Sequence, residues 1–465
     1  MYAHCLTADD SQNNETIIRL CSLWFMNFSD DSLNSSVLHQ ALEEIPSHKF
    51  AFLAHQISAR LSSSNDPGHK NVRSLMARLC RDHPFHTLYQ VYALASPRPS
   101  VNPTTTSRRQ SRNAATADSQ SQNGRDEAAR AILDQLQQDS RVSKRVAEFV
   151  RLCDACLQWA KYSLKADKAL KDSKTKMVPT HLELAKLKDL NVPVSTAYTP
   201  IDLACRYEDN IVRVQRYGSK FSTAGGINLP KISDCLGEDG ERYKQLFKGE
   251  GEDDLRQDAV MEQVFELVNI LLQRDRASKK RNLSVRTYKV IPLAAQAGML
   301  EFVTNTMPLG GWLLNAHRKY SPNDWLPQKC NENLRKARTT GKPQVLLDTF
   351  MEIRKHFKPV MRHFFTEAHK LPTAWFDMRL NYQRSVATTS IVGHVLGLGD
   401  RHLSNILIHN MTGEVVHIDL GIAFDQGRLL PIPETVPFRL TADMVDGLGS
   451  SGTEGVYRRC AEETL

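Results

Sequence analysis

The stretch LGLGDRHLSNIL, residues 396–407, places Asp, Arg, His and Asn on one short loop just before an apolar run. The run NILI leads into the turn signal NMTG and then into EVVHID, which predicts a β-hairpin centred near residue 412. Antiparallel pairing then places Asn405, at the start of the first strand, beside Asp419, at the end of the second. Asp400 stands just before them, so three oxygen-bearing side chains share one end of the predicted hairpin.

Oxygen ligands grouped in this way suit a hard cation such as Mg²⁺, which keeps several waters and bridges to substrate phosphates. A hairpin mouth whose polar groups only cap one another is the alternative. The spacing favours the metal: Asp400-x4-Asn405 followed by Asp419-Leu-Gly matches the catalytic loop and metal-binding Asp of protein kinases. The difference is that Arg and His follow the first Asp here instead of preceding it.

The composition is that of an ordinary globular protein. The chain has 465 residues, 41% hydrophobic and 24% charged, which suggests two to four domains. No apolar run approaches the ~20 residues that a membrane span needs, and the nine cysteines show no disulfide framework. The net charge of +8 favours anionic partners. We see no DNA-binding motif and no basic stripe, so direct contact with nucleic acid is left open.

The pattern of apolar residues divides the chain. Helical spacing over residues 1–96 and again over 128–190 predicts two runs of short helices. Residues 97–127 between them are rich in Ser, Thr, Asn, Arg and Pro, so we expect a disordered linker. Strand-like and helical segments alternate over 191–303, and long helices dominate 304–465. The sequence therefore predicts an α+β protein with helical repeats, a small mixed lobe and a mostly helical lobe.

Within the mixed lobe, residues 210–218 and 284–293 are predicted strands because of their β-branched and aromatic content. The segment DAVMEQVFELVNILLQRD between them is predicted to be an amphipathic helix. Its apolar residues lie on one stripe, which we expect to be buried: Val260, Val264, Phe265, Val268 and Leu271.

Two stretches of this lobe suit a nucleotide. In YGSKFSTAGGINLPK, residues 217–231, we predict a turn between strands where backbone N–H groups around Ser219 and Lys220 approach phosphates. In LFKGEGEDDLRQD, Lys248 ends a strand-like run and an acidic cluster leads into the helix. Kinases contact the α- and β-phosphates with a Lys on a strand, steadied by a carboxylate near the next helix. A solvated surface lysine is the alternative for Lys248.

The segments GLGDRHLSNIL, VHIDLGIAF, PETVPFRLT, DDLRQD and GGINLPK resemble those of the phosphatidylinositol 3-kinase-related protein kinases. HIDLGIAFDQG and QRSVATTS resemble the ATM/Tel branch in particular. The resemblance is specific over residues 185–465, and residues 1–185 would correspond to the end of the helical FAT domain. It implies a FAT-type α-solenoid followed by a bilobal kinase. Its C-lobe would be incomplete here, because family members continue into further helices and a FATC segment.

The resemblance implies a role for each candidate residue. Asp400 would orient the substrate hydroxyl and accept its proton, and His402 would lie beside the γ-phosphate and stabilise the transition state. Asn405 and Asp419 would hold Mg²⁺. Lys248 would contact the ATP phosphates.

The partner of this lysine would be Asp258 or Asp253, because two extra residues in KGEGEDD relative to the family pattern leave both open. The segment MLEFVTNT would be the hinge that holds adenine. Glu301 and Val303 would contact the base through backbone groups, and Phe302 would stack on it.

The substrate is indicated by the segment after Asp419. Lipid kinases of the same fold share the DRH-x2-N loop, but they need a Lys/Arg cluster after the metal-binding Asp to neutralise a head group. This segment has only Arg428 and Arg439, well apart, which favours a serine/threonine protein kinase. The alternatives are a lipid kinase and a catalytically inactive scaffold of the same fold.

The resemblance also implies cofactors and partners. The enzyme would use ATP and Mg²⁺ and phosphorylate proteins at Ser/Thr-Gln sites. It would act in the nucleus, in DNA-damage and telomere signalling, with a DNA-break sensor complex. In its full-length form it would be a homodimer.

Overall fold

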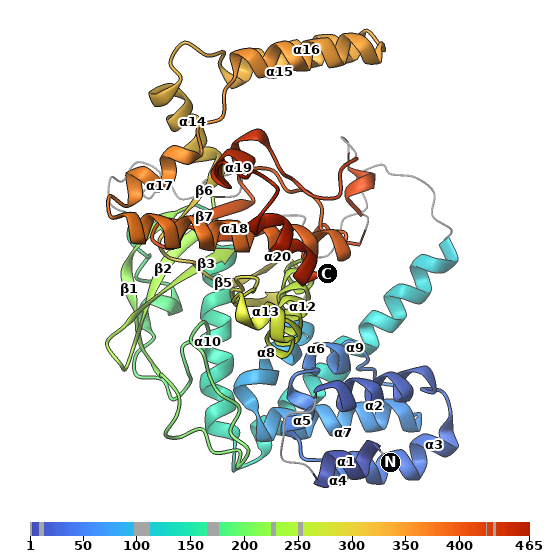
Figure 1. Ribbon diagram of the computed structural model, residues 1–465. Helices are drawn as coiled ribbons and strands as arrows, with labels where there is room; N and C mark the ends of the chain where they lie inside the picture. The colour runs from blue at the N-terminus through green and yellow to red at the C-terminus, as the bar shows by residue number, and fades with distance from the viewer. Residues whose placement is uncertain are drawn as a thin grey trace. The chain divides into compact units, whose positions relative to one another are not determined.

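The computed structural model describes residues 2–8, 14–96, 112–164, 176–224, 229–249, 254–424, 426–430 and 434–465. The chain divides into two compact units, shown in Figure 1. Unit 1 comprises Met1–Val260 and Lys289–Phe302, and unit 2 comprises Met261–Tyr288 and Val303–Leu465. The protein is α+β, as predicted, with many helices and small antiparallel sheets. The boundaries of helical repeats and lobes remain a prediction.

Unit 1 begins with a run of helices, two of which start at a capping aspartate. Asp66 precedes α7 (Pro67–Asp82) and accepts a hydrogen bond from the backbone N–H of His69 at 2.9 Å. Asp30 caps α3 (Asp31–Ser35) in the same way. The other helices of unit 1 that precede its sheet are α1 (Tyr2–Ala8), α2 (Asn14–Met26), α4 (Val37–Glu44), α5 (His48–Ala51), α6 (Ala54–Ser58), α8 (Pro84–Ala95), α9 (Arg112–Gln138), α10 (Ser143–Lys161) and the 3-10 helix η1 (Glu183–Lys186).

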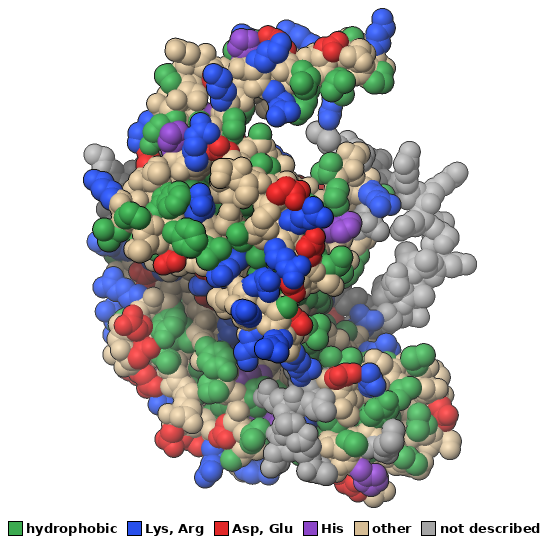
Figure 2. Space-filling model, viewed as in Figure 1, with side chains coloured by type: hydrophobic (Ala, Val, Ile, Leu, Met, Phe, Trp, Pro, Cys, Tyr) green, Lys and Arg blue, Asp and Glu red, His purple; other side chains and the backbone are tan. Residues whose placement is uncertain are grey.

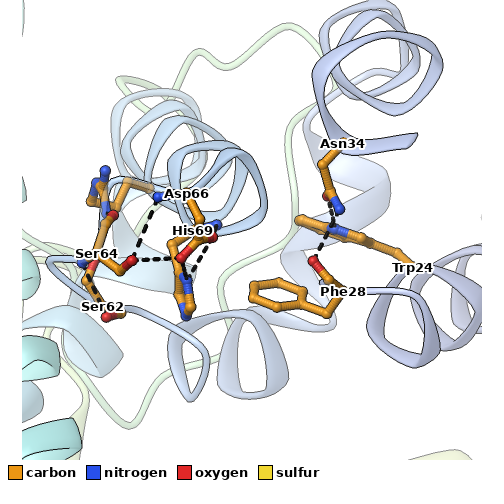
Figure 3. A network of polar contacts seen from close by, with 8 residues as sticks. Trp24, Phe28, Asn34, Ser62, Ser64, Asp66 and His69 are labelled. Carbon is orange, nitrogen blue, oxygen red and sulfur yellow. Dashed lines mark hydrogen bonds and ion pairs between the residues drawn. The ribbon is translucent and has the colours of Figure 1, made fainter. Parts of the chain in front are cut away.

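Polar side chains also connect these helices, as Figure 3 shows. The indole Nε1 of Trp24 donates to Asn34 Oδ1 at 3.0 Å, and Asn34 Nδ2 donates to the carbonyl oxygen of Phe28 at 3.0 Å. Nearby, His69 Nδ1 lies 2.6 Å from Asp66 Oδ2. Trp24 and Asn34 are both buried, so their hydrogen bond satisfies groups that burial would otherwise leave unpaired.

The structure corrects part of the prediction of a disordered linker over residues 97–127. Residues 97–111 lie outside the described residues, whereas α9 is helical from Arg112. The later turns of α9 bury Ala129, Ile132 and Leu136 in the core of unit 1. A helix anchored in this way extends at little cost through preceding residues, because propagation is much easier than nucleation.

Unit 1 also contains a five-stranded antiparallel sheet in the order β1-β2-β3-β5-β4. Its strands are β1 (Val214–Thr223), β2 (Lys231–Gly237), β3 (Arg242–Lys248), β4 (Val290–Ala294) and β5 (Ala297–Glu301). The predicted strand at 210–218 is present but starts later and runs further. Of the predicted strand at 284–293, only the part from Val290 onward is strand.

The last helix of the N-terminal run packs directly on this sheet. Trp159 of α10 donates from its indole nitrogen to Ser233 Oγ of β2 at 3.1 Å. Lys231 of β2 is buried, and its Nζ donates to the carbonyl oxygens of Ala160 and Tyr162 at 2.9 Å each. These carbonyls lie at the C-terminal end of α10, where a helix leaves acceptors unsatisfied and favours positive charge. One hydrophobic core therefore extends from the helices into the sheet.

The predicted amphipathic helix is α12 (Leu255–Arg274), but its buried stripe differs from the prediction. Met261, Phe265 and Leu272 are buried, with Val268 packed partly against them. Leu271 is 60% exposed, so its assignment to the buried stripe is wrong. These three buried positions are four and seven residues apart, so they lie on one face of the helix. That face includes Leu272 and leaves Leu271 beside it, towards solvent. Val260 and Val264 are only half-buried.

Unit 2 is organised around the long helix α18 (Pro372–Val395), whose Tyr382, Val386 and Ala387 are fully buried. Ser385 Oγ of α18 accepts the backbone N–H of Val415 at 3.1 Å, which ties the helix to a three-stranded sheet. The other elements of unit 2 are α13 (Arg276–Lys280), β6 (Thr306–Pro308), α14 (Leu309–Tyr320), α15 (Pro327–Thr339), α16 (Pro343–His356), α17 (Arg362–Ala368), β7 (Ile406–His409), β8 (Val415–His417), η2 (Gln426–Leu429), α19 (Ala442–Gly447) and α20 (Val456–Thr464).

Basic side chains gather on the surface of unit 2 over α13 and α20, as Figure 2 shows. The exposed members are Arg274, Arg276, Lys279, Lys280, Arg458 and Arg459. On α20, Arg458 and Arg459 pair with Glu454, Glu462 and Glu463. Among the described helices, none combines the length and the apolar character that a bilayer crossing requires.

Candidate active site

The hairpin predicted from the opening stretch is present in unit 2 as β7 and β8. Its register pairs Ile406 with His417 and Ile408 with Val415. The backbone N–H of Ile418 donates to the carbonyl oxygen of Asn405 at 3.0 Å, one pair beyond the strands. Asn405 therefore lies opposite Ile418, the residue before Asp419, so the predicted hairpin is present with its register shifted by one residue. The placement of the Asn405 and Asp419 side chains at one metal site remains a prediction.

The loop before β7 folds back on itself through Asp400. This residue has φ 56°, in the left-handed region, and its carbonyl oxygen accepts the N–H of His402 at 3.0 Å and Nδ2 of Asn405 at 3.1 Å. The carboxylate of Asp400 is 41% exposed, and His402 Nε2 lies 3.9 Å from its Oδ2 with the ring 54% exposed. The loop therefore presents an acid–base pair to solvent and keeps Asn405 buried behind it.

Arg401 holds this loop through its buried side chain. The sequence gives no sign of this role. The side chain is only 6% exposed. Its Nε donates to the carbonyl oxygen of Gly399 at 2.7 Å, its Nη1 to that of Ile418 at 2.8 Å, and its Nη2 to that of Asp419. Burial lowers the pKa of Arg401, and the nearby carboxylates of Asp400 and Asp419 oppose that effect. One guanidinium thus joins the loop before β7 to the end of β8.

Next to this arginine, the half-buried His417 stays neutral. Burial, with a smaller contribution from the Arg401 charge, lowers the pKa of His417 to about 3. Its Nδ1 is buried and has no hydrogen-bond partner among the described residues. His417 therefore adds no charge to the hairpin mouth at neutral pH.

The donors at the hairpin mouth fit a hard cation. Because Nδ2 of Asn405 donates to Asp400, the amide oxygen is left as a ligand, and it accepts no hydrogen bond from the described residues. Asp419, with φ 60°, adds a carboxylate. The described residues contain no cluster of three or more His, Cys, Asp or Glu side chains suited to a metal. An amide oxygen and one carboxylate suit Mg²⁺, which takes its remaining ligands from water and phosphates.

In unit 1, the candidate phosphate-binding lysine ends a strand, as predicted. Lys248 is half-buried at the end of β3, where it pairs with Gly298 of β5. Asp258 lies in the first turn of α12 with a buried side chain. Asp253, the other candidate partner, lies outside the described residues. The pairing of Lys248 with either carboxylate remains a prediction.

The predicted turn at residues 217–231 is wrong in its first half. Ser219 and Lys220 lie within β1, with exposed side chains, and the strand continues to Thr223. The reason is an additional partner: the backbone N–H of Val178 donates to the carbonyl oxygen of Ser219 at 2.8 Å. Residues 225–228 of the turn lie outside the described residues. A phosphate-binding role for Ser219 and Lys220 remains a prediction.

The predicted hinge lies where the chain passes from unit 1 to unit 2. The N–H of Glu301 donates to the carbonyl oxygen of Lys289 at 2.8 Å, and that of Phe302 to the carbonyl oxygen of Lys244 at 3.0 Å. The N–H of Val303 donates no hydrogen bond to the described residues. Its backbone donor is therefore available, as adenine recognition by Val303 requires.

Comparisons with known proteins agree with this geometry. Residues 243–465 match the family described as phosphatidylinositol 3- and 4-kinase. The whole chain is 40% identical over 475 residues to the serine/threonine-protein kinase tel1 of Aspergillus oryzae, and 42% identical over 476 residues to the serine-protein kinase ATM of Sus scrofa. It spans 15% of the length of each of these relatives.

Solved structures are similar over the whole chain as well. The structure titled "FAT and kinase domain of CtTel1" matches with a TM-score of 0.87 at 36% identity, and this chain covers 31% of it. The structure titled "Complete CtTel1 dimer with C2 symmetry" matches with a TM-score of 0.87 at 36% identity, with 16% covered. The similarity includes the helical region, which the family match does not cover.

Proposed function

We propose a function for this chain from its membership of the phosphatidylinositol 3- and 4-kinase family, in which it is homologous over its whole length to the Tel1 and ATM protein kinases. It transfers the γ-phosphate of ATP to a serine or threonine hydroxyl of a protein. The observation that carries the proposal is the hairpin mouth, where the loop that bears Asp400, His402 and Asn405 is hydrogen-bonded to the chain just after β8.

Each residue has a separate task in this reaction. The exposed carboxylate of Asp400 orients the substrate hydroxyl and accepts its proton as the oxygen attacks the γ-phosphorus and the bond to the bridging oxygen of ADP breaks. His402, beside this carboxylate, donates to the phosphoryl oxygens as charge spreads over them. Asn405 and Asp419 hold Mg²⁺, which neutralises phosphate charge when bound.

Further residues bind the nucleotide. Lys248 contacts the phosphates, steadied by Asp258 or Asp253. The backbone of Glu301 and Val303 binds adenine and Phe302 stacks on it. Ser219 and Lys220 contribute from β1.

A protein substrate is favoured over a lipid because basic residues are sparse after Asp419. Arg428 and Arg439 are the only basic residues between Asp419 and Thr441. Burial lowers the pKa of Arg439, and the nearby Glu434 carboxylate opposes that effect, so this arginine lies beside an acid.

We further propose Ser/Thr-Gln sites as substrates, nuclear signalling of DNA damage and telomere state with a DNA-break sensor complex, and a homodimer like the titled CtTel1 dimer.

The test compares Asp400→Ala and Asp419→Ala with the exposed control Asp377→Ala in the purified protein. Both site variants should lose phosphorylation of a Ser-Gln peptide, while only Asp419→Ala should lose Mg²⁺-dependent nucleotide binding. The control should match the wild type. More than a few per cent activity in Asp400→Ala would refute the assignment. Nucleotide binding without turnover would favour the inactive scaffold, and phosphorylation of phosphatidylinositol but not the peptide would favour the lipid kinase.

A further inference from the structure

The segment that follows Asp419 contacts the catalytic loop through backbone hydrogen bonds, from Gly399 N–H to Ile422 and from Phe424 N–H to Leu396, and through the carboxylate of Glu434. Glu434 Oε1 accepts the backbone N–H of Asp400 at 2.7 Å, although 34 residues separate the two in sequence. The backbone N–H of Glu434 donates to the carbonyl oxygen of Gly427 in η2 at 3.2 Å. The Glu434 side chain thus connects η2 and the following segment to Asp400.

The carboxylate occupies a slot that only glycines permit. A Cβ atom on Gly399 would lie 2.8 Å from Glu434 Oε2, and one on Gly427 would lie 2.5 Å from the same oxygen. The two glycines also face each other, because a Cβ on Gly399 would come within 3.0 Å of the Gly427 Cα. Real Cβ atoms essentially never approach other atoms to less than 3.0 Å. An alanine at either position would therefore displace the carboxylate.

Two arginines provide the charge environment of this carboxylate. The positive charges of Arg401 and Arg439 both lie near enough to Glu434 for its carboxylate to oppose the lowering of their pKa by burial. Nε of Arg439 is buried and makes no hydrogen bond to the described residues. A hydrogen bond from a backbone N–H to an ionised acceptor is about twice as strong as a neutral one.

The backbone of Asp400 needs such an anchor. With φ 56° it stands in the left-handed region, which is unfavourable for a residue with a side chain. If its N–H lost its acceptor, the backbone could relax and turn the exposed carboxylate away from the substrate. The same N–H–carboxylate bond, together with the bond from Glu434 N–H to the Gly427 carbonyl, connects η2 to the loop.

We propose that Glu434 is a positioning residue that holds Asp400 in its reactive conformation and makes that conformation depend on the docked segment after Asp419. The inference rests on the proposed kinase function. Glu434 touches neither metal nor nucleotide in this assignment, so its loss lowers kcat and leaves the KM for ATP nearly unchanged. A residue that only stabilised the fold would instead lower the melting temperature and the amount of active enzyme together.

The test uses Glu434→Ala, Glu434→Gln and, independently, Gly427→Ala, with Glu454→Gln as the control at an exposed position of unit 2. On a Ser-Gln peptide with ATP and Mg²⁺, Glu434→Ala should lower kcat about 30- to 100-fold with the KM for ATP within about threefold of wild type. Glu434→Gln keeps an acceptor oxygen and should recover part of the loss. Gly427→Ala should resemble Glu434→Ala although the carboxylate is present. Glu454→Gln should leave kcat unchanged.

The outcomes separate this inference from the proposed function. An inactive wild type or an active Asp400→Ala would remove the kinase assignment itself. An active wild type and an inactive Asp400→Ala, together with a kcat within twofold of wild type in Glu434→Ala or Gly427→Ala, would overturn only the role of Glu434. If Glu434→Ala fails to fold, Gly427→Ala decides: a kcat within twofold of wild type overturns the role, and a kcat loss at unchanged melting temperature supports it.

Discussion

Replacement of Arg401 by methionine should destabilise unit 2 and inactivate the enzyme together. Methionine keeps part of the apolar stem but removes three hydrogen bonds, to the carbonyl oxygens of Gly399, Ile418 and Asp419. A hydrogen bond from a charged donor contributes about 1.5–3 kcal/mol, and the three are not additive because they share one guanidinium. We therefore expect a loss of about 3–5 kcal/mol in the free energy of unfolding. For a unit of this size that corresponds to about 10 °C in melting temperature.

The assay is thermal unfolding followed by fluorescence, alongside phosphorylation of a Ser-Gln peptide. Arg401→Lys keeps the charge but cannot reach three carbonyls with one ammonium group, so its melting temperature should fall between those of Arg401→Met and wild type. The matched control is Arg458→Met. Arg458, like Arg401, binds several oxygen atoms, here the carboxylates of Glu454 and Glu462, but its side chain is exposed. Exposed ion pairs contribute little, so the control should melt within 2 °C of wild type. The reasoning is refuted if Arg401→Met melts no lower than the control.

Two further predictions concern unit 1. Burial and the nearby His86 lower the pKa of His83 to about 4. The stability that depends on neutral His83 is therefore fully present above the unfolded pKa of ~6.5 and is lost as the pH falls towards 4. Between pH 7 and 5 this amounts to about 2 kcal/mol, and urea unfolding of His83→Gln at both pH values should show a correspondingly smaller difference than the wild type. Lys231→Met removes the donor to the carbonyl oxygens of Ala160 and Tyr162 and should lower the free energy of unfolding by about 2–3 kcal/mol. Its control, Lys244→Met at an exposed position, should leave that free energy almost unchanged. Equal melting temperatures of the two variants would contradict the role of Lys231.

The local features of the site could be predicted because they depend on neighbours in sequence. NMTG fixes the hairpin turn, and the alternation of the flanking residues fixes the register that brings Asn405 beside the end of β8. The contacts of Arg401 and Glu434 could not be predicted. Each depends on a partner 17 to 34 residues away, and an Arg or a Glu in a loop gives no signal of where its side chain will bind.

The errors in the fold have the same origin. Residues 217–223 contain a glycine and two serines and suggested a turn, but the segment at Met177 and Val178 supplies a pairing partner that extends β1. The polar residues at the start of α9 predict a linker, whereas later turns anchored in the core hold the helix. Leu271 was placed on the buried stripe because apolarity alone does not show which face of α12 meets the core.

The continuous core of unit 1 bears on how this part of the protein unfolds. Val178, Leu182, Leu184, Leu187 and Leu190 belong to the same cluster as Phe149 of α10 and Phe247 of β3. A cut at residue 191, the boundary suggested by the sequence, would strip the sheet of side chains that fill its own interior. Helices and sheet should therefore melt in one cooperative transition. A substitution deep in α10 would then raise the frequency with which β3, and Lys248 at its end, open transiently. If Lys248 contacts the phosphates as proposed, such a substitution would shorten the lifetime of the bound nucleotide without touching it.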